Sequence, residues 1–180
     1  MLQNKDWHTG SNRQIKFPEI KDIVLEYLDR GARIYIGSDS FTTQDKVCFA
    51  STICLHGPSL GGRYFFFREN EKSEHFLQLV TRITEETRRS VELAEILMSE
   101  CLIAPSDIEL HLDVSPFNTK NGTSKFSEML KGYLLSNIDT EGRKIEANDL
   151  WKEKIVKINE IKKEEDLEFF KSWFRGKYAK

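Results

Sequence analysis

Two carboxylates in this chain each stand at the end of a run of strand-forming residues. Asp39 lies in the stretch Ile-Tyr-Ile-Gly-Ser-Asp-Ser at residues 34–40, and Asp113 ends the stretch Ile-Glu-Leu-His-Leu-Asp at residues 108–113. The small residues around Asp39 would let a metal ion or a phosphate approach the backbone closely. Two neighbouring carboxylates repel each other unless a divalent cation neutralises them, and oxygen ligands suit Mg²⁺ or Mn²⁺. The pair therefore indicates a metal site, provided that the fold brings the two stretches together.

The stretch around Asp39 also has a simpler interpretation, as a turn that ends a strand. Asp and Ser favour turns because their side chains bond nearby backbone groups. The second stretch favours the metal site, because its alternation puts Glu109, His111 and Asp113 on one strand face. If the two strands are parallel neighbours, Asp39 and Asp113 emerge at one edge of the sheet. We interpret His111 as an ordinary strand histidine rather than as a hydrogen-bond partner of the site.

The elements that must position these residues follow from hydrophobic periodicity and from Gly and Pro breaks. Residues 1–14 are polar and are expected to form a loose arm. The expected helices cover residues 18–30, 73–101, 124–136 and 164–178, and the expected strands cover residues 33–39, 47–55, 63–68, 108–113 and 154–161. The long helix at residues 73–101 provides a crossover long enough to make the first and fourth strands parallel. The order of elements predicts one α/β domain over residues 1–180.

Composition limits the environment and the partners of the protein. The chain has 180 residues and a net charge of −2, so any surface for nucleic acid must be local. Three cysteines without a metal-ligand spacing are expected to be reduced, mostly buried thiols of a cytoplasmic protein: Cys48, Cys54 and Cys101. The first 14 residues contain neither an apolar signal core nor a membrane-spanning run. We therefore expect no membrane association.

Three short motifs, in this order, resemble the ribonuclease H-like superfamily and, within it, the YkuK-type family. They are Ile-Gly-Ser-Asp-Ser at residues 36–40, Glu-Thr-Arg-Arg-Ser-Val-Glu-Leu-Ala at residues 86–94 and Leu-His-Leu-Asp-Val at residues 110–114. The similarity spans roughly residues 34–136. It implies an α/β fold with a five-stranded mixed sheet and flanking helices. It also implies a nuclease acting on RNA, DNA or a hybrid, in which carboxylates hold two Mg²⁺ or Mn²⁺ ions. One ion would activate a water, and the other would stabilise the leaving 3′ oxygen.

Asp39 and Asp113 carry over from the family's motifs as catalytic residues and metal ligands, and the long helix must supply a glutamate. The helix offers Glu85, Glu86, Glu92 and Glu95. On a helical wheel Glu86 flanks the apolar stripe, roughly 75° from its centre, whereas Glu85 and Glu92 fall toward solvent. We therefore choose Glu86. Glu92 stays open as an alternative, because Glu-Leu-x-Ala also recurs in ribonucleases H.

A fourth metal ligand is expected from the C-terminal third, where Asp166 is the nominated residue and Asp149 and Glu160 are alternatives. Asp166 also suits the first turn of a helix for purely electrostatic reasons. The tail over residues 143–180 carries eleven Lys or Arg against eight Asp or Glu, which could help to hold a polyanion.

Two other functions stay open. One is a ribonuclease H-like domain that binds nucleic acid or a protein without cleaving. The other is a phosphoryl-transfer enzyme related to acetate or sugar kinases. The lack of a Gly-rich phosphate loop after the first hairpin argues against the latter.

Overall fold

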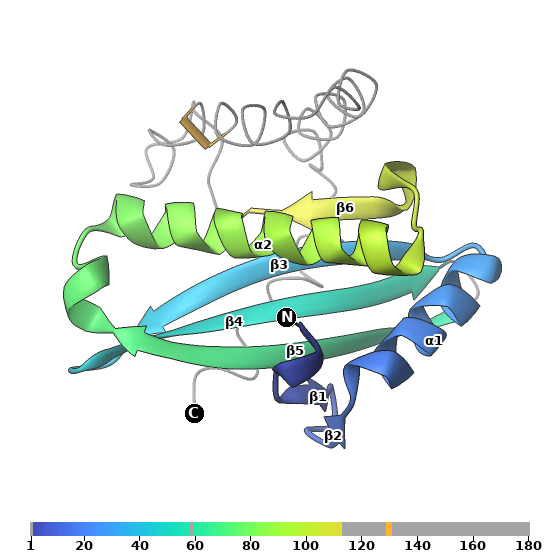
Figure 1. Ribbon diagram of the computed structural model, residues 1–180, viewed down its shortest axis with the longest axis horizontal. Helices are drawn as coiled ribbons and strands as arrows, with labels where there is room; N and C mark the ends of the chain where they lie inside the picture. The colour runs from blue at the N-terminus through green and yellow to red at the C-terminus, as the bar shows by residue number, and fades with distance from the viewer. Residues whose placement is uncertain (1, 58–59, 113–128, 131–180) are drawn as a thin grey trace.

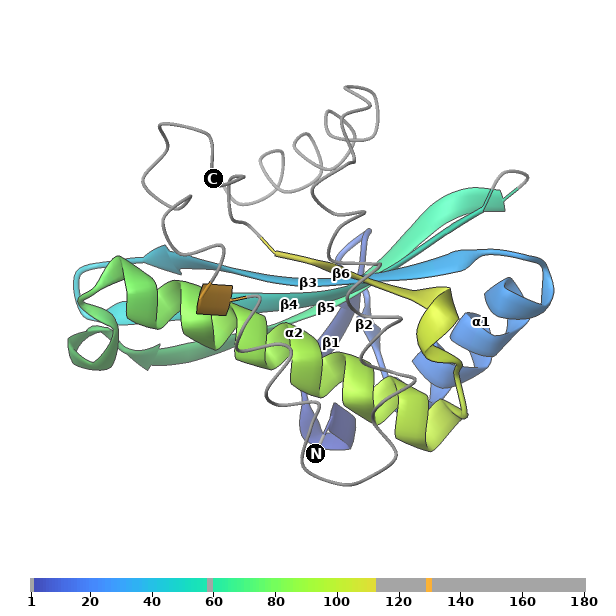
Figure 2. The same ribbon diagram turned by 90° about the horizontal axis from the view of Figure 1, so that it is seen from above.

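The computed structural model describes residues 2–57, 60–112 and 129–130 (Figure 1). Its elements, in chain order, are η1 (Leu2–Asn4), β1 (Trp7–Thr9), β2 (Gln14–Ile15), α1 (Phe17–Asp29), β3 (Arg33–Thr42), β4 (Lys46–Gly57), β5 (Leu60–Lys72), η2 (Ser73–Phe76), α2 (Leu79–Cys101), η3 (Pro105–Asp107) and β6 (Ile108–His111). Within the described residues the strands form one mixed sheet in the order β2-β1-β5-β4-β3-β6. Seen along the sheet, α1 and α2 lie on the same side of it (Figure 2). The described part is therefore an α/β structure, as the sequence predicts.

The first and fourth expected strands are adjacent and parallel. Ile34 pairs with Ile108, and the ladder runs in register to Gly37 and His111. Both strands bury their apolar residues, because a parallel strand between a helix layer and a neighbouring strand has little exposed surface. The adjacency predicted for these two strands is confirmed over this ladder. Asp113 itself lies outside the described residues.

Asp39 lies inside a strand, so the interpretation of its stretch as a turn is wrong. β3 continues to Thr42, and the antiparallel ladder with β4 pairs Asp39 with Ala50. The strand was also expected to end at Asp39. It is longer because pairing with β4 satisfies the backbone groups of the small and polar residues, which would otherwise favour a turn. Asp39 therefore stands two residues beyond Gly37, where the described pairing with β6 ends.

The N-terminal residues form structure where a loose arm was expected. β1 pairs with both β2 and β5. Trp7 is fully buried, with its ring centroid 4.6 Å from that of Phe67, and its Nε1–H donates to the carbonyl oxygen of Leu2 at 3.0 Å. Burial of one large aromatic side chain outweighs the polar composition around it. β1 and β2 also explain why six strands are described where five were expected, and the expected strand over 154–161 lies outside the described residues.

The core lies between the helices and one face of the sheet. It joins Ile34 and Ile36 of β3 to residues of β4, β5, α1 and α2, among them Leu93 and Leu97. The expected helix over 18–30 is confirmed as α1, and Gly31 follows it with a φ of +79°, a conformation that favours glycine after a helix. The long helix begins at Leu79 rather than at residue 73, because residues 73–76 form η2.

The three cysteines are buried and unpaired with one another, as expected. Burial raises the pKa of the Cys54 thiol to about 12, so this thiol stays protonated at neutral pH. No helix in the described part of the chain is both long enough and apolar enough to span a membrane.

Candidate functional site

The α2 helix turns Glu86 toward the sheet. The side chain of Glu92 is 54% exposed, whereas Glu86 is only 8% exposed. The helical-wheel prediction is therefore confirmed for these two residues. It was wrong for Glu85, whose side chain is only 17% exposed, because Arg88 and Arg89 cover it with ion pairs. A wheel calculated from apolar residues does not include this cover by long arginine side chains.

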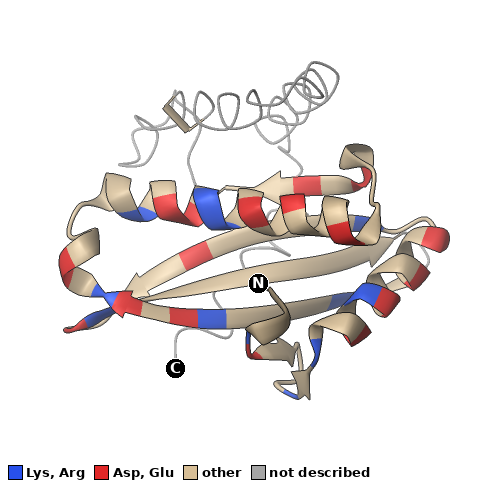
Figure 3. Cartoon of the chain, in the orientation of Figure 1, with Lys and Arg blue, Asp and Glu red and all other residues tan. Residues whose placement is uncertain are grey.

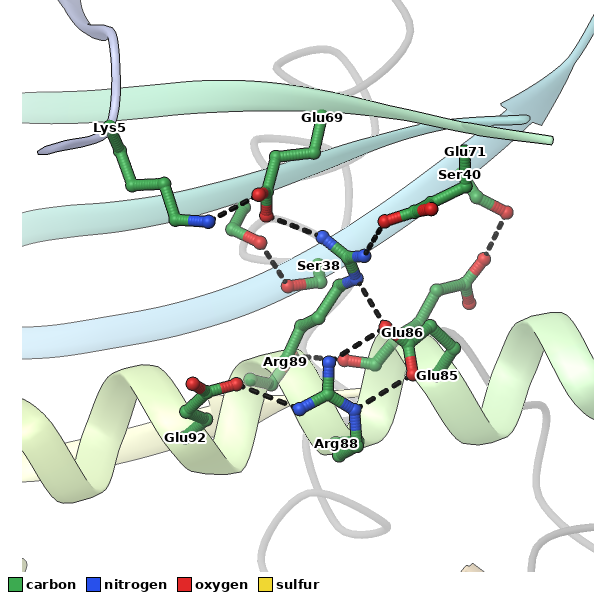
Figure 4. A network of polar contacts seen from close by, with 12 residues as sticks. Lys5, Ser38, Ser40, Glu69, Glu71, Glu85, Glu86, Arg88, Arg89 and Glu92 are labelled. Atoms are coloured by element: carbon green, nitrogen blue, oxygen red, sulfur yellow. Dashed lines mark hydrogen bonds and ion pairs between the residues drawn. The ribbon is translucent and has the colours of Figure 1, made fainter. Parts of the chain in front are cut away.

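Ser40 contacts both of the described carboxylates that the sequence nominated. Its hydroxyl donates a hydrogen bond to Oε1 of Glu86 at 2.5 Å (Figure 4). Its backbone N–H donates to Oδ1 of Asp39 at 2.7 Å. One strand residue therefore links the carboxylate of β3 to the carboxylate of α2.

The two carboxylates reach Ser40 from different sides of the sheet. Ile34, Ile36 and Ser40 share the face of β3 that meets α2, since the first two belong to the core and the third bonds Glu86. Successive strand residues alternate between faces, so Asp39 leaves β3 from the opposite face. Its carboxylate turns back toward its own strand to accept the N–H of Ser40.

The structure thus links two of the four nominated ligands through Ser40, with Glu86 on the α2 side of β3 and Asp39 on the other side. Asp113 and Asp166 lie outside the described residues, as do the alternatives Asp149 and Glu160. Within residues 2–57, 60–112 and 129–130, no three or more His, Cys, Asp or Glu side chains are grouped so as to hold a metal ion.

Small hydroxyl residues surround Glu86 in the layer between β3 and α2. Ser38 of β3 bonds Ser51 of β4 at 2.8 Å, and both are almost fully buried. Ser90, fully buried, donates its hydroxyl to the backbone oxygen of Glu86 at 2.9 Å. Small side chains let the helix approach the sheet closely, and their mutual bonds satisfy polar groups that water does not reach. Glu86 is therefore held in a compact polar layer.

Arg89 is a buried residue of this region that the sequence did not single out. Its guanidinium pairs with Glu69 at 2.6 Å, Glu85 at 2.7 Å and Glu71 at 3.3 Å (Figure 4). It also lies over the ring of Phe49, 4.4 Å from the ring centroid. The signal for it is present in the sequence. Glu69 and Glu71 alternate on a strand, and Arg89 follows Glu86 by three residues, which places it on the same helix face. The cluster fixes the rotation of α2, and so the direction of Glu86.

The charges of this cluster also determine the state of Glu85. Burial alone would raise the pKa of Glu85, but hydrogen bonds and charge from Arg88 and Arg89 outweigh it and hold that pKa below its usual range. The hydrogen bonds that Arg88 donates to Glu85 are the main reason that the pKa of Arg88 is raised. Both side chains are therefore charged at neutral pH, and the cluster acts as a set of ion pairs.

His111 lies on β6 beside Gly37, with its ring 5.5 Å from that of Tyr35 and nearly edge-on to it. Burial lowers the pKa of His111, while the charge of Glu109 opposes the shift. The imidazole is therefore neutral at physiological pH. A half-buried, neutral ring beside a tyrosine fits the interpretation of His111 as a strand histidine.

Comparison with models of protein families identifies a family for this chain. Residues 16–138, more than half of the chain, match the family described as Ribonuclease H-like. No curated protein and no solved structure matches the chain. The matched range covers α1, β3 to β6 and α2, and so includes Asp39, Ser40 and Glu86.

Proposed function

The chain belongs to the ribonuclease H-like family, and from that premise we propose that it is a metal-dependent nuclease that hydrolyses phosphodiester bonds of RNA or DNA. The observation that carries the proposal is the double contact of Ser40. Its hydroxyl binds Glu86 and its N–H binds Asp39. Two acidic residues, nominated from separate motifs, thereby bond the same residue of the strand that pairs in parallel with β6, one from each face of that strand.

The donor set suits a hard divalent cation. Asp39 and Glu86 offer carboxylate oxygens, the ligands that Mg²⁺ and Mn²⁺ prefer. We propose Asp113, which follows β6 by two positions in the sequence, and Asp166 as the further ligands. When bound, two such ions supply an activated water and stabilise the leaving 3′ oxygen.

The protein's own contribution is to hold its carboxylates charged and correctly oriented. A hydroxyl that donates to a carboxylate favours the ionised form, which is the form that binds metal. Ser40 does this for Glu86, and the ion pairs of Arg89 keep α2 from rotating Glu86 away from the sheet. Asp39 receives the N–H of Ser40, and this bond restrains its carboxylate in the same way.

A non-catalytic role is the second candidate, and one observation favours it. Glu86 is only 8% exposed and bonded to Ser40, which is also what a purely structural carboxylate would show. The domain would then bind nucleic acid or a protein partner without cleaving it.

The deciding experiment is Mn²⁺-dependent cleavage of labelled single-stranded RNA, single-stranded DNA, hybrid and branched DNA. We expect Asp113→Asn and Glu86→Gln to lose activity by orders of magnitude, because both ions must contact one phosphate. Glu92→Gln is the matched control on the same helix and should be near wild type, since Glu92 is exposed and pairs only with Arg88 among the contacts described. Loss of activity in Glu92→Gln with full activity in Glu86→Gln would exchange their roles.

A metal-binding measurement accompanies the cleavage assay. Mn²⁺ should raise the melting temperature of the wild type, because a ligand that binds only the native state stabilises it. Asp39→Asn should abolish this response. An inactive wild type that also fails to bind Mn²⁺ would favour the non-catalytic role.

A further inference from the structure

In the last part of β5, acidic and basic residues lie on opposite faces of the sheet. This part reads Arg68, Glu69, Asn70, Glu71 and Lys72. Glu69 and Glu71 pair with Arg89 of α2, so they lie on the face that the helices cover. By alternation Arg68, Asn70 and Lys72 lie on the opposite face, and all three are exposed. Figure 3 shows the charged residues of both signs along this part of β5.

The register of the sheet places these residues on the same face as Asp39. Lys72 pairs with Lys46, so two lysines are direct neighbours across β4 and β5. Two further rows run across β3, β4 and β5: Asp39, Ala50 and Arg68 form one, and Phe41, Cys48 and Asn70 form the other. Neighbouring strands are about 4.8 Å apart and strand residues rise about 3.3 Å each. The backbones of the three cationic residues therefore lie roughly 10–16 Å from the backbone of Asp39.

The surface formed by Phe41, Lys46, Arg68, Asn70 and Lys72, here called the open β face, carries positive charge. Like charges placed directly opposite each other in a sheet destabilise it, so the pairing of Lys46 with Lys72 has a cost in the unbound protein. An anion between them would remove that cost.

Two acids lie at the rim of the open β face. Asp45 precedes Lys46, and Glu74 lies 3.7 Å from Lys72. The pair of Lys72 and Glu74 is strongly exposed, with side chains 78% and 65% accessible. Exposed pairs of this kind are weak, so a phosphate can compete with the glutamate for the lysine. Asp39 is a third acid on this side of the sheet, so the excess of positive charge is local to the neighbouring lysines Lys46 and Lys72.

We propose that the open β face binds the backbone of a single-stranded nucleic acid and leads it to Asp39. The proposal rests on the proposed nuclease function and names the form of its substrate. Lys46, Lys72 and Arg68 contact phosphates, and Asn70 offers an amide to a phosphate or a base edge.

Phe41 is the reason to choose a single strand over a duplex. Its side chain is 42% exposed, and its neighbour in the row is the small residue Cys48. An exposed aromatic ring on the same face as cations is an arrangement on which unpaired bases stack, because every base has a π-face. In a duplex the bases are already stacked on one another, so the ring would gain no such contact.

The test is fluorescence anisotropy of a labelled single-stranded oligonucleotide, measured with EDTA so that neither metal binding nor cleavage contributes. We expect Lys46→Ala/Lys72→Ala to bind at least tenfold more weakly. For this double variant, the slope of log affinity against log salt concentration should be smaller in magnitude by about 1.4, because each phosphate contact to a single strand contributes about 0.7 to that slope. Phe41→Ala should weaken binding about tenfold or more with an unchanged salt slope.

A charge-matched control separates this face from the net charge of the protein. Arg13→Ala/Lys16→Ala removes two exposed cations between β1 and α1 and should leave the affinity within about twofold of wild type. Equal losses in the two double variants, or no loss in either, would overturn the proposal. Equal binding of duplex and single strand, with no effect of Phe41→Ala, would overturn its single-stranded form.

The outcome is independent of whether the protein cleaves. If oligonucleotide binding depends on the open β face but no cleavage occurs with Mn²⁺, this inference stands and the nuclease proposal fails. If the wild type cleaves and Lys46→Ala/Lys72→Ala binds and cleaves equally well, the nuclease proposal stands and this inference is wrong. Melting curves should first show that every variant is folded.

Discussion

Removal of the Ser40 hydroxyl tests the link between β3 and Glu86 most directly. Ser40→Ala deletes the 2.5 Å hydrogen bond to the Glu86 carboxylate but keeps the backbone N–H that Asp39 accepts. A hydrogen bond to a charged group is worth about 1.5–3 kcal/mol, and Glu86 is only 8% exposed, so water replaces the lost donor poorly. We expect the variant to lose about 2 kcal/mol of unfolding free energy at pH 7.

The pH dependence distinguishes a bond to a charged carboxylate from an ordinary buried hydroxyl. Protonation of Glu86 removes the negative charge that the hydroxyl stabilises. The stability difference between wild type and Ser40→Ala should therefore shrink when the solution is acidified enough to protonate this carboxylate. Ser38→Ala is the matched control, because Ser38 lies on the same face of β3 and bonds a neutral partner, Ser51, at 2.8 Å. Its cost should be about 1 kcal/mol and independent of pH.

Urea unfolding at several pH values measures both variants. If Ser40→Ala loses no more stability than Ser38→Ala at pH 7, and the difference does not change with pH, the hydroxyl does not support a charged Glu86. Ser40 would then not join two functional carboxylates. If the protein is a metal-dependent nuclease, Ser40→Ala should also weaken Mn²⁺ binding by more than Ser38→Ala does.

Two further predictions concern the fold around the site. Arg89→Ala should lower the free energy of unfolding, measured in urea, by about 2–4 kcal/mol, in the lower part of that range because Glu69 and Glu71 are partly exposed. Arg89→Lys should restore only part of this stability, and a loss below about 0.5 kcal/mol in Arg89→Ala would contradict the role given to the cluster. Leu102 follows α2 with a φ of 54° and is 89% exposed, so glycine at this position would relieve the left-handed backbone conformation without loss of buried surface. Leu102→Gly should therefore raise the free energy of unfolding by roughly 0.5–1 kcal/mol, and a lower melting temperature would contradict this.

The features that could be predicted from the sequence are those in which burial of one face of an element produces a regular spacing of apolar residues. Alternation in residues 108–113 and the run at residues 34–36 identified two strands, and a long crossover made them parallel neighbours. The period of α2 put Glu86 on the buried flank and Glu92 outside. In each case, the spacing of apolar residues within one element was sufficient.

What could not be predicted depends on pairing between distant segments. Asp39 was expected at the end of a strand, but the ladder with β4 carries β3 on to Thr42. The N-terminal residues 1–14 were expected to be a loose arm, but Trp7 packs against the rings of Phe17 and Phe67. Arg89 was not singled out, because its partners Glu69 and Glu71 lie on β5, a separate element. The composition of a segment does not show which distant segments it will contact in the folded protein.

The same alternation that separates Asp39 from Ser40 on β3 separates cations from acids on β5. A slip of β5 by one residue would put Glu69 and Glu71 on the open β face and turn Arg68 and Lys72 toward α2. Arg89 opposes such a slip, because only the present register lets its guanidinium reach both glutamates. The buried ion pairs on one face therefore maintain the positive charge on the other. It follows that the Arg89 cluster, although it lies across the sheet from Asp39, helps to decide what can bind beside Asp39.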